Sequence, residues 1–334
     1  MCAAVPGTSG VGLVRAVDRY TWYASLARLA PSKHNTQPWR FGITGAALDV
    51  WADPSRRLPA SDPLGRELVV ACGAAVQGAV VAATALGVEL SVEPWPDGPT
   101  GPVARLTETG RTSPSEQDLL LLDAVRARRT DRGPLDGRAL PASLPFLLRD
   151  AAEQHGCALR LVRNEGDQRA LARLIELADR QLARSPEVEE ELRAWLRPPQ
   201  DERADGVPAR ASRGSQASYT APYVQRDFSL PDVEHAHERD GVDDPLVAVL
   251  CTPADAPLNW LQGGRALMSV LLTATAGGAG ASYLNQPLEV PALRDVLTRD
   301  LDLVGHPQAV LRIGLGARVP VPPRRPLPQL RLHP

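Results

Sequence analysis

The stretch 30–39, APSKHNTQPW, crowds polar side chains onto one turn beside an aromatic residue. Pro31 ends the helical pattern that precedes it, and five hydrogen-bonding residues follow. Such polar density next to an aromatic ring suits the binding of a planar heteroaromatic ligand that is rich in carbonyl and N–H groups. An equally good interpretation is a turn that ends the helix and caps itself. The five polar residues are Ser32, His34, Asn35, Thr36 and Gln37.

A second polar stretch, RRTDR at 128–132, lies where another helical pattern ends. Its donors are Arg128, Arg129, Thr130 and Arg132. Guanidinium forks and a hydroxyl are the groups that a phosphate monoester requires. By itself, however, a basic run at the end of a helix is more often a solvated surface that favours the helix dipole. Arg324 and Arg325 are equally ambiguous alone, although the prolines around them indicate a placed segment.

Other catalytic patterns find little support. His235 and His237, flanked by Glu234 and Glu238, lack a third ligand nearby, so a solvated charged segment is the favoured interpretation and no metal is expected. The glycines at 277–280 follow a helix, which argues against a dinucleotide fingerprint. No G-x-S-x-G elbow is present. The chemistry therefore belongs more plausibly to a bound cofactor than to a protein nucleophile, and no catalytic residue is named.

Composition and charge limit the classes of protein to consider. The chain has 334 residues, which at about 150 residues per domain favours two units. Lys and Arg total 37 against 39 Asp and Glu, a net charge of −2 that gives no reason to expect a nucleic acid or a membrane as partner. No transmembrane or secretory segment is expected, and Cys2, Cys72, Cys157 and Cys251 are scattered. We therefore expect a cytoplasmic protein with reduced thiols.

Short-range patterns outline the elements of a first unit. The small-residue stretch VVACGAAVQGAVVAATAL predicts a helix that Gly87 closes. Shorter apolar runs bounded by turn residues predict strands on both sides of it. The predicted helices span about 13–29 and 67–86, and the predicted strands 48–51, 88–93 and 102–108.

A second unit begins near Ser113. The sequence Ser113-Pro114-Ser115-Glu116 combines an N-cap hydroxyl, a proline in the first turn and a glutamate three residues after the cap. Residues 197–245 carry many charges and prolines, so we interpret them as a lid or a partly disordered insertion that limits the size of the substrate. Its candidate anchors are Tyr219, Tyr223 and Phe228. The predicted helices span 171–182, 187–195 and 257–275, and the predicted strands 246–251 and 308–315.

An internal repeat connects the two units. GAAVQGAVVAATALGV at 73–88 and GRALMSVLLTATAGGA at 264–279 match at several Gly, Ala and Thr positions in the same register. A period of about 190 residues indicates the duplication of one ancestral unit. The alternative is that buried helices rich in alanine resemble one another by composition.

A series of short motifs occurs in order along nearly the whole chain. Together they resemble the nitroreductase superfamily, and most closely its Acg-type FMN-binding oxidoreductases, in which two nitroreductase-like halves lie in one chain. The string P-S-x-x-N-x-Q-P-W is specific, and the arginine motifs gain meaning from their position relative to it. The motifs are Ala30-Pro31-Ser32-x-x-Asn35-x-Gln37-Pro38-Trp39, Asp62-Pro63-x-Gly65-Arg66-Glu67, Cys72-Gly73-Ala74-Ala75, Arg128-Arg129-Thr130-x-Arg132-Gly133-Pro134, Ser282-Tyr283-Leu284-Asn285-Gln286-Pro287 and Pro323-Arg324-Arg325-Pro326.

The resemblance implies an α+β fold with a central sheet flanked by helices, duplicated in one chain as an intramolecular pseudo-dimer. Residues 1–112 would form the first half, with the flavin-ring motif. Residues 113–334 would form the second half, with the FMN-phosphate motifs and the lid-like insertion 197–245. The chain would then act as a monomer or a weak homodimer.

The resemblance also implies which residues bind the cofactor, FMN. The phosphate and ribityl chain would be held by Arg128, Arg129, Thr130, Arg132 and Arg324 or Arg325. The isoalloxazine ring would be approached by Pro31, Ser32, Asn35 and Gln37 from the first half and by Leu284, Asn285 and Gln286 from the second. An FMN phosphate carries roughly −1.5 to −2 charges and requires several donors.

Members of the superfamily pass two electrons from NAD(P)H through the flavin to an acceptor. We therefore expect an FMN-dependent oxidoreductase that transfers hydride between NAD(P)H or another donor and a small-molecule substrate. An FMN-sequestering or ligand-sensing flavoprotein without efficient turnover is the alternative, and a helical scaffold without cofactor is a third. Nitro compounds, quinones, enones and a biosynthetic intermediate remain open as acceptors.

We further expect one FMN per chain. The first half contains Pro31-Ser32-x-x-Asn35 but no Arg-Arg-Thr, whereas the second half contains Arg128-Arg129-Thr130. The segment 175–185, taken as the counterpart of the ring motif, lacks P-S-x-x-N. The two complete motifs would therefore build a single site.

Overall fold

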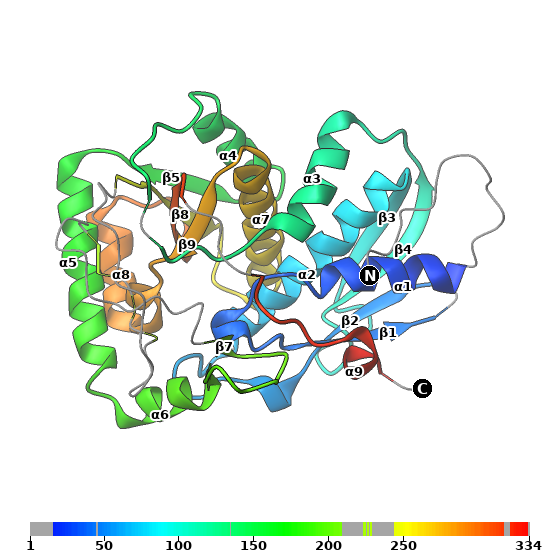
Figure 1. Cartoon of the computed structure of the whole chain (residues 1–334), viewed down its shortest axis with the longest axis horizontal. Coiled ribbons are helices and arrows are strands. Elements are labelled where there is room, and N and C mark those ends of the chain that lie inside the picture. Colours follow the sequence, from blue (N-terminus) through cyan, green and yellow to red (C-terminus); the bar gives the residue numbers. More distant parts are fainter. Residues whose placement is uncertain are drawn as a thin grey trace.

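A computed structural model gives the fold of the chain as a mixture of helices and sheets, as the α+β expectation required (Figure 1). Most of the chain is described, and each element named below lies within it. Tyr219, His235 and His237 lie outside the described residues. The described residues are 16–44, 46–133, 135–208, 223, 224, 226, 228, 244–316 and 321–332.

The first sheet is antiparallel throughout, with strand order β1-β2-β4-β3. Its strands alternate between buried and more exposed residues, which is typical of a sheet with one face on the core. The helices α1 and α2 pack on that inner face. The bounds are α1 Ala16–Ala27, β1 Trp39–Ile43, β2 Leu48–Ala52, α2 Arg66–Ala85, β3 Val88–Pro94 and β4 Ala104–Arg111.

The second sheet is also antiparallel, with order β5-β8-β10-β9. Its central strands are buried on both faces because helices cover both of them, α4 and α7 on one face and α5 and α8 on the other. The described residues thus form two four-stranded sheets, each covered by helices on at least one face. The bounds are α4 Leu144–Glu153, β5 Ala158–Val162, α5 Glu165–Leu182, β8 Leu246–Thr252, α7 Pro257–Ala276, β9 Gly280–Tyr283, α8 Pro291–Asp300 and β10 His306–Gly314.

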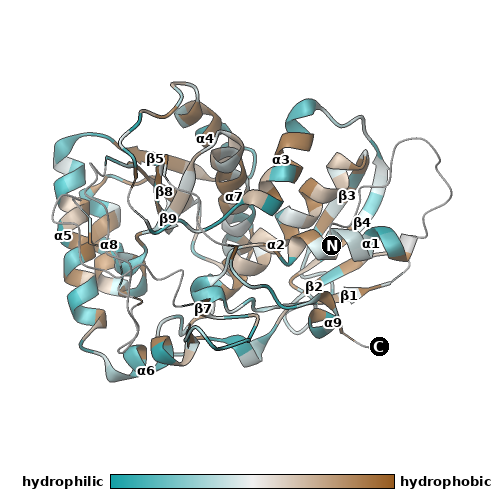
Figure 2. Cartoon of the chain, viewed as in Figure 1, coloured by the Kyte–Doolittle hydropathy of each residue, from teal (hydrophilic) through white to brown (hydrophobic). Residues whose placement is uncertain are grey.

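The two sheets are joined through the crossing of α2 and α7. A Cβ atom at Gly73 would overlap the carbonyl oxygen of Leu261, and a Cβ atom at Gly264 would overlap that of Val70. The two backbones therefore touch, which only glycine permits. Figure 2 shows the apolar residues that surround this crossing, whereas the outlying helix α6, Pro186–Trp195, is mainly hydrophilic.

Helix α2 is the one helix among the described residues that is long and apolar enough to cross a membrane. It is the helix that we predicted at 67–86, and 78% of its most apolar window is buried inside the protein. Since α1 and α7 pack against it, its composition is that of a core helix. Gly87, with a φ of 70°, ends the helix as expected.

Several local predictions need correction. The helix α3, Glu116–Ala127, is capped by Ser115 and not by Ser113, because the Ser115 hydroxyl accepts from the Asp118 N–H while the Asp118 carboxylate accepts from the Ser115 N–H. Among the elements of the two sheets and their helices, we did not predict β1, α4, β5, β9 or α8. The helices and strands that we did predict are present, with ends shifted by a few residues.

The remaining segments are the loop 30–38, the helix α5, the pair of short strands and the C-terminal segment, and their positions in the fold could not be read from the order of the sequence. Helix α5 lies between β5 and β8, whereas the loop 30–38 lies between α1 and β1, so the assignment of 175–185 as the counterpart of that loop is wrong. The short strands β6, Leu196–Arg197, and β7, Val207–Pro208, form a separate pair. The C-terminal segment crosses to the first sheet, where the Leu332 N–H donates to the Phe41 carbonyl and the short helix α9, Leu327–Leu330, packs.

Candidate functional site

A cavity lies beside the α2–α7 crossing and the second sheet, with walls from segments that are far apart in the sequence. The empty space within it, counted out to open solvent, is about 800 Å³. Its apolar wall comes from the α2–α7 crossing. It is lined by Pro31, Ser32, Lys33, His34, Glu67, Val70, Ala71, Thr130, Arg132, Arg226, Phe228, Leu267, Tyr283, Asn285, Gln286, Glu289, Gln308 and Ala309.

The loop from Pro31 to Gln37 contributes one end of the cavity. Three of its residues that are not glycine adopt positive φ, His34 at 49°, Asn35 at 55° and Gln37 at 51°. Such a concentration of left-handed backbone is costly and is typical of functional loops. The Ser32 hydroxyl accepts from the Gln37 N–H at 2.9 Å, which closes the loop on itself, and Pro31 and Ser32 also line the cavity.

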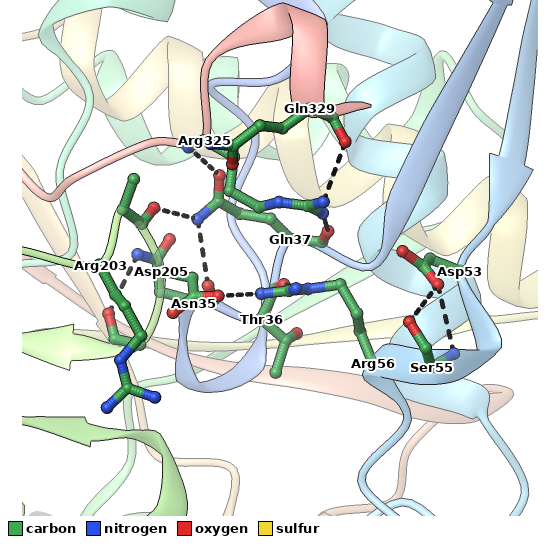
Figure 3. A network of polar contacts seen from close by, with 12 residues as sticks. Asn35, Thr36, Gln37, Asp53, Ser55, Arg56, Arg203, Asp205, Arg325 and Gln329 are labelled. Atoms are coloured by element: carbon green, nitrogen blue, oxygen red, sulfur yellow. Dashed lines mark hydrogen bonds and ion pairs between the residues drawn. The ribbon is translucent and has the colours of Figure 1, made fainter. Parts of the chain in front are cut away.

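Asn35 and Gln37 do not line the cavity; they fasten the C-terminal segment instead. The Asn35 side-chain amide donates to the carbonyls of Gly206 and Pro323, and its oxygen accepts from Arg324 at 2.6 Å. The Gln37 side-chain oxygen accepts from the Arg325 N–H at 2.8 Å (Figure 3). These two residues therefore position the neighbours of the cavity rather than its contents.

The consecutive residues Arg324 and Arg325 have different surroundings. The Arg325 guanidinium donates to the backbone oxygens of Gln37 and Gln329, as Figure 3 shows. The Arg324 guanidinium lies among Arg28, Arg128 and Arg129. Its pKa is lowered to about 9, mainly because the group is buried and also because these three neighbours carry positive charge. Of the two candidates for a phosphate ligand, the structure places Arg324 with the other predicted arginines.

We call Arg28, Arg128, Arg129 and Arg324 the arginine cluster. Among the described residues, none of the four forms an ion pair with a carboxylate; their hydrogen-bond partners are backbone carbonyls and the Asn35 amide oxygen. Burial lowers the pKa of Arg128, whose Nε atom is buried without a hydrogen-bond partner in the described part of the chain. Buried cations without counter-charge are costly, so the cluster fits an anion. Sequence reasoning missed Arg28, which follows directly after α1, because it belongs to no arginine motif.

Arg132 and Tyr283 line the cavity, and Tyr283 also lies near Arg128 and Arg324 of the arginine cluster. The Arg132 guanidinium lies 4.4 Å from the centre of the Phe228 ring, and it makes no hydrogen bond to any residue whose position is described. Its pKa is lowered to about 10, mainly by burial. The Tyr283 hydroxyl is buried and has no hydrogen-bond partner within the described ranges. Burial raises its pKa to about 12, although the positive charges of Arg128 and Arg132 act to lower it.

The edge of the second sheet sets the position of the segment 130–132. Thr130 pairs with Ala281 of the edge strand β9, and the Asp131 N–H donates to the Ala281 carbonyl at 2.8 Å. Because side chains alternate along extended backbone, Thr130 and Arg132 face the same side, toward the cavity.

The three residues after β9, 284–286, have different surroundings: two line the cavity and one lies in the core. Asn285 and Gln286 line the cavity, where the Asn285 oxygen accepts from the Val310 N–H and the Gln286 amide donates to the Val224 carbonyl. Leu284, which we also expected near the flavin ring, does not line the cavity. Its side chain is fully buried in the core between the second sheet and α8.

Sequence reasoning missed an ionic wall on one side of the cavity, formed by Lys33, Glu67, Arg226 and Glu289. Lys33 Nζ lies 3.0 Å from Glu289 Oε2 and 3.7 Å from Glu67 Oε2, and Arg226 Nη2 lies 2.9 Å from Glu289 Oε2. The motif that contains Glu67 was a signal that could have found that residue. Glu289 and Arg226 gave no signal, because they meet the others only through the fold.

The chain was also compared with known proteins. A comparison with models of protein families gave no match. A Mycobacterium tuberculosis (strain H37Rv) protein named "Putative NAD(P)H nitroreductase Rv3131" is 32% identical over 315 residues, 92% of this chain and 89% of that protein. One named "Putative NAD(P)H nitroreductase acg" is 30% identical over 315 residues, 91% of this chain and 92% of its own length.

Among solved structures, a nitroreductase with bound FMN from Bacteroides fragilis is 15% identical and covers 59% of this chain and 88% of its own, with a TM-score of 0.37. An agreement at that level carries no argument here. The two curated relatives, by contrast, match over nearly their whole lengths, and they share the family to which the sequence motifs pointed. The chain therefore belongs to the Acg-type branch of the nitroreductase family.

Proposed function

We propose that the protein is an FMN-dependent oxidoreductase that transfers hydride between NAD(P)H, or another donor, and a small organic acceptor. The observation that carries the proposal is the arginine cluster, whose four cations form no ion pair with a described carboxylate and which approaches the cavity at Tyr283. FMN, when bound, supplies the two-electron chemistry. The relatives named as NAD(P)H nitroreductases support the same reaction class.

The arginine cluster would hold the phosphate of FMN. Its charge complements a phosphate dianion, and the unpartnered Nε of Arg128 is a donor that an anion would satisfy. The buried hydroxyl of Tyr283, which has no hydrogen-bond partner among the described residues, is a second group that could bond to the ligand. Arg324 belongs to the arginine cluster, whereas Arg325 forms hydrogen bonds to Gln37 and Gln329.

The cavity would hold the flavin ring. Pro31 and Ser32 from one wall and Thr130, Asn285 and Gln286 from the other supply a few polar groups, while Val70, Ala71 and Leu267 supply apolar surface. A mainly apolar cleft with a few placed polar groups is the usual composition of a cofactor site. The positive charge of Arg132 on this wall would favour electron density on a reduced ring.

We also propose that the chain is a duplicated unit that acts as its own pseudo-dimer, with halves 1–112 and 113–334. Both sheets have the same strand order, and in both a 20-residue helix follows the second strand in that order. The symmetric approach of Gly73 and Gly264 supports a two-fold relation between the halves. The C-terminal segment, which crosses to the first sheet, would tie the halves together.

A flavoprotein that sequesters FMN without efficient turnover is the second candidate. It is favoured by Phe228, a residue of the inserted segment, whose ring covers Arg132 on the cavity wall. A segment in that position could exclude a substrate. Anaerobic titration of the purified yellow protein with NADH and NADPH tests the second candidate. Rapid bleaching would exclude it, whereas a flavin that resists both would favour sequestration or a donor other than NAD(P)H.

The cofactor itself is tested by a double variant, Arg128→Ala with Arg129→Ala. We expect it to retain little FMN after desalting, because several charge-assisted hydrogen bonds of roughly 1.5–3 kcal/mol each are lost. Arg173→Ala, which removes an exposed arginine of α5, is the matched control. A double variant that stays as yellow as the control would contradict the proposal.

A further inference from the structure

The ionic wall of the cavity contains two carboxylates that differ in their partners. Glu289 Oε2 is held by both Lys33 and Arg226, at 3.0 and 2.9 Å, and its side chain is 3% exposed. Glu67 Oε1 accepts from Arg66 at 2.9 Å, but Glu67 Oε2 accepts no hydrogen bond from a described residue and has only Lys33 at 3.7 Å. Glu67 therefore has one oxygen free on the cavity side.

Protonation of Glu67 would leave its neighbours with other partners. Lys33 keeps Glu289 and the Ser61 carbonyl, which accepts from Nζ at 3.0 Å. Arg66 keeps the backbone and side-chain oxygens of Gln308, at 3.0 and 3.1 Å. A neutral Glu67 therefore leaves both cations with hydrogen-bond partners, although Arg66 then has no carboxylate partner among the described residues.

The charges around Glu67 come from several elements. Burial raises the pKa of Glu67, the positive charges of Lys33 and Arg66 lower it, and those of Glu289 and Asp62 raise it, with a net upward shift. Arg226 and Tyr283 also face this side of the cavity. By contrast, Arg226 and Lys33 hold the pKa of Glu289 down at about 2.

We propose that Glu67 is the proton donor to an acceptor bound in the cavity. The proposal rests on the proposed function. A two-electron hydride donor supplies the electron pair and one hydrogen to the acceptor, the O–H bond of Glu67 breaks, and its proton forms a new O–H or N–H bond on the acceptor. The Glu67 carboxylate regains a proton from water, so hydride and proton together balance the reduction.

The other titratable groups on the cavity wall are less suited to this task. His34 is buried, and its pKa is well below the ordinary value, mainly through burial. The Tyr283 hydroxyl has a pKa raised to about 12, which makes it a weak acid. Glu289 is held ionised by two cations. A catalytic acid works best when its pKa is near the working pH, and Glu67 is shifted in that direction.

The first test measures the proton directly. Infrared spectra of the purified holoprotein, recorded as the pH rises, should show loss of the carbonyl band of a protonated carboxyl group. Glu67→Gln should lack this band. Glu108→Gln, which removes an Arg19-paired carboxylate that does not line the cavity, should retain it. A band of unchanged size in Glu67→Gln would overturn the proposal.

The second test measures transfer of the proton. Dithionite-reduced holoprotein is mixed with 1,4-benzoquinone in H2O and in D2O. We expect the wild-type rate to fall as the pH rises through the pKa of Glu67, with a solvent isotope effect. Glu67→Gln should be about 100-fold slower and nearly independent of pH. Glu67→Asp should recover part of the rate and the pH dependence, and Glu108→Gln should match the wild type.

The two possible failures are distinguishable. Equal rates, pH profiles and isotope effects in wild type and Glu67→Gln, at equal flavin content, would overturn the role of Glu67 and leave the proposed function intact. A yellow wild-type protein that fails to reduce benzoquinone at any pH would overturn the proposed function and, with it, this role.

Discussion

Gly73 of α2 and Gly264 of α7 lie against each other where the two helices cross, and each faces the carbonyl oxygen of the residue three positions before the other, Leu261 or Val70. The relation is reciprocal, as in the interface between two copies of one subunit. The number of residues that separates Gly73 from Gly264 also separates the first residue of α2 from the first residue of α7, and the last residue of α2 from the last residue of α7. The cavity opens beside this crossing, so its apolar wall depends on the close approach.

Substitution of either glycine should destabilise the whole protein. We expect Gly73→Ala or Gly264→Ala to lower the free energy of unfolding by about 1–3 kcal/mol or more, because a methyl group must push the two backbones apart. Urea unfolding followed by circular dichroism measures this. Gly78→Ala, on the same helix but with its nearest atom at 3.3 Å, is the control and should cost less. Equal stability of all three variants would contradict a close-packed crossing.

The two neighbouring arginines should differ in their effect on flavin affinity. Arg324→Ala should weaken FMN binding about 10- to 100-fold, the equivalent of one charge-assisted hydrogen bond. It should leave the affinity for riboflavin, which has no phosphate, nearly unchanged. Quenching of flavin fluorescence gives both dissociation constants.

Arg325→Ala is the matched comparison, because this guanidinium contacts Gln37 and Gln329 instead of the arginine cluster. It should lower stability more than it lowers the preference for FMN over riboflavin. An FMN preference that depends on Arg325 and not on Arg324 would refute the assignment of the phosphate site.

The saturated protein should contain one FMN per chain. If the chain is duplicated as we propose, the counterpart of the loop 30–38 by element order is the short connection between α4 and β5, residues 154–157, which is too short for a second ring motif. Flavin absorbance relative to protein concentration after saturation and desalting gives the ratio. A value near two would contradict the single-site proposal.

His155 should make the protein less stable in mild acid. Its Nε2 lies 2.9 Å from the Ser269 hydroxyl oxygen, and burial, followed by the charge of Arg265, lowers its pKa to about 4. Between about pH 6.5 and 4 the unfolded chain therefore binds a proton that the folded chain does not, so stability falls as the pH falls. With allowance for partial exposure, the loss is on the order of 1–2 kcal/mol.

His155→Gln removes this titration and keeps a group that can bond to Ser269. The slope of stability against pH between 6.5 and 4 should then be smaller than in wild type, as urea midpoints at each pH would show. Parallel curves for the two proteins would exclude His155 as the source.

Local sequence was sufficient for the elements whose residues carry a strong short-range pattern. The helices α2 and α7, the strands β3, β4, β8 and β10 and the stop at Gly87 follow from apolar periodicity and from the conformational freedom of glycine. The motifs also indicated the family, since their residue types and order persist along the whole chain. The prediction of the residue that caps α3 was wrong because Ser113 and Ser115 both fit the N-cap pattern, and only the observed hydrogen bonds distinguish them.

The tertiary structure decided what each polar residue faces. Prolines hold 323–326 extended, so consecutive side chains point to opposite sides, and only the fold shows that Arg324 meets the arginine cluster while Arg325 meets Gln37. The same holds for Glu67, Arg226 and Glu289, which lie on separate elements and meet at one wall. Local patterns record periodicity and propensity, whereas such convergence depends on how the two sheets pack across the Gly73–Gly264 crossing.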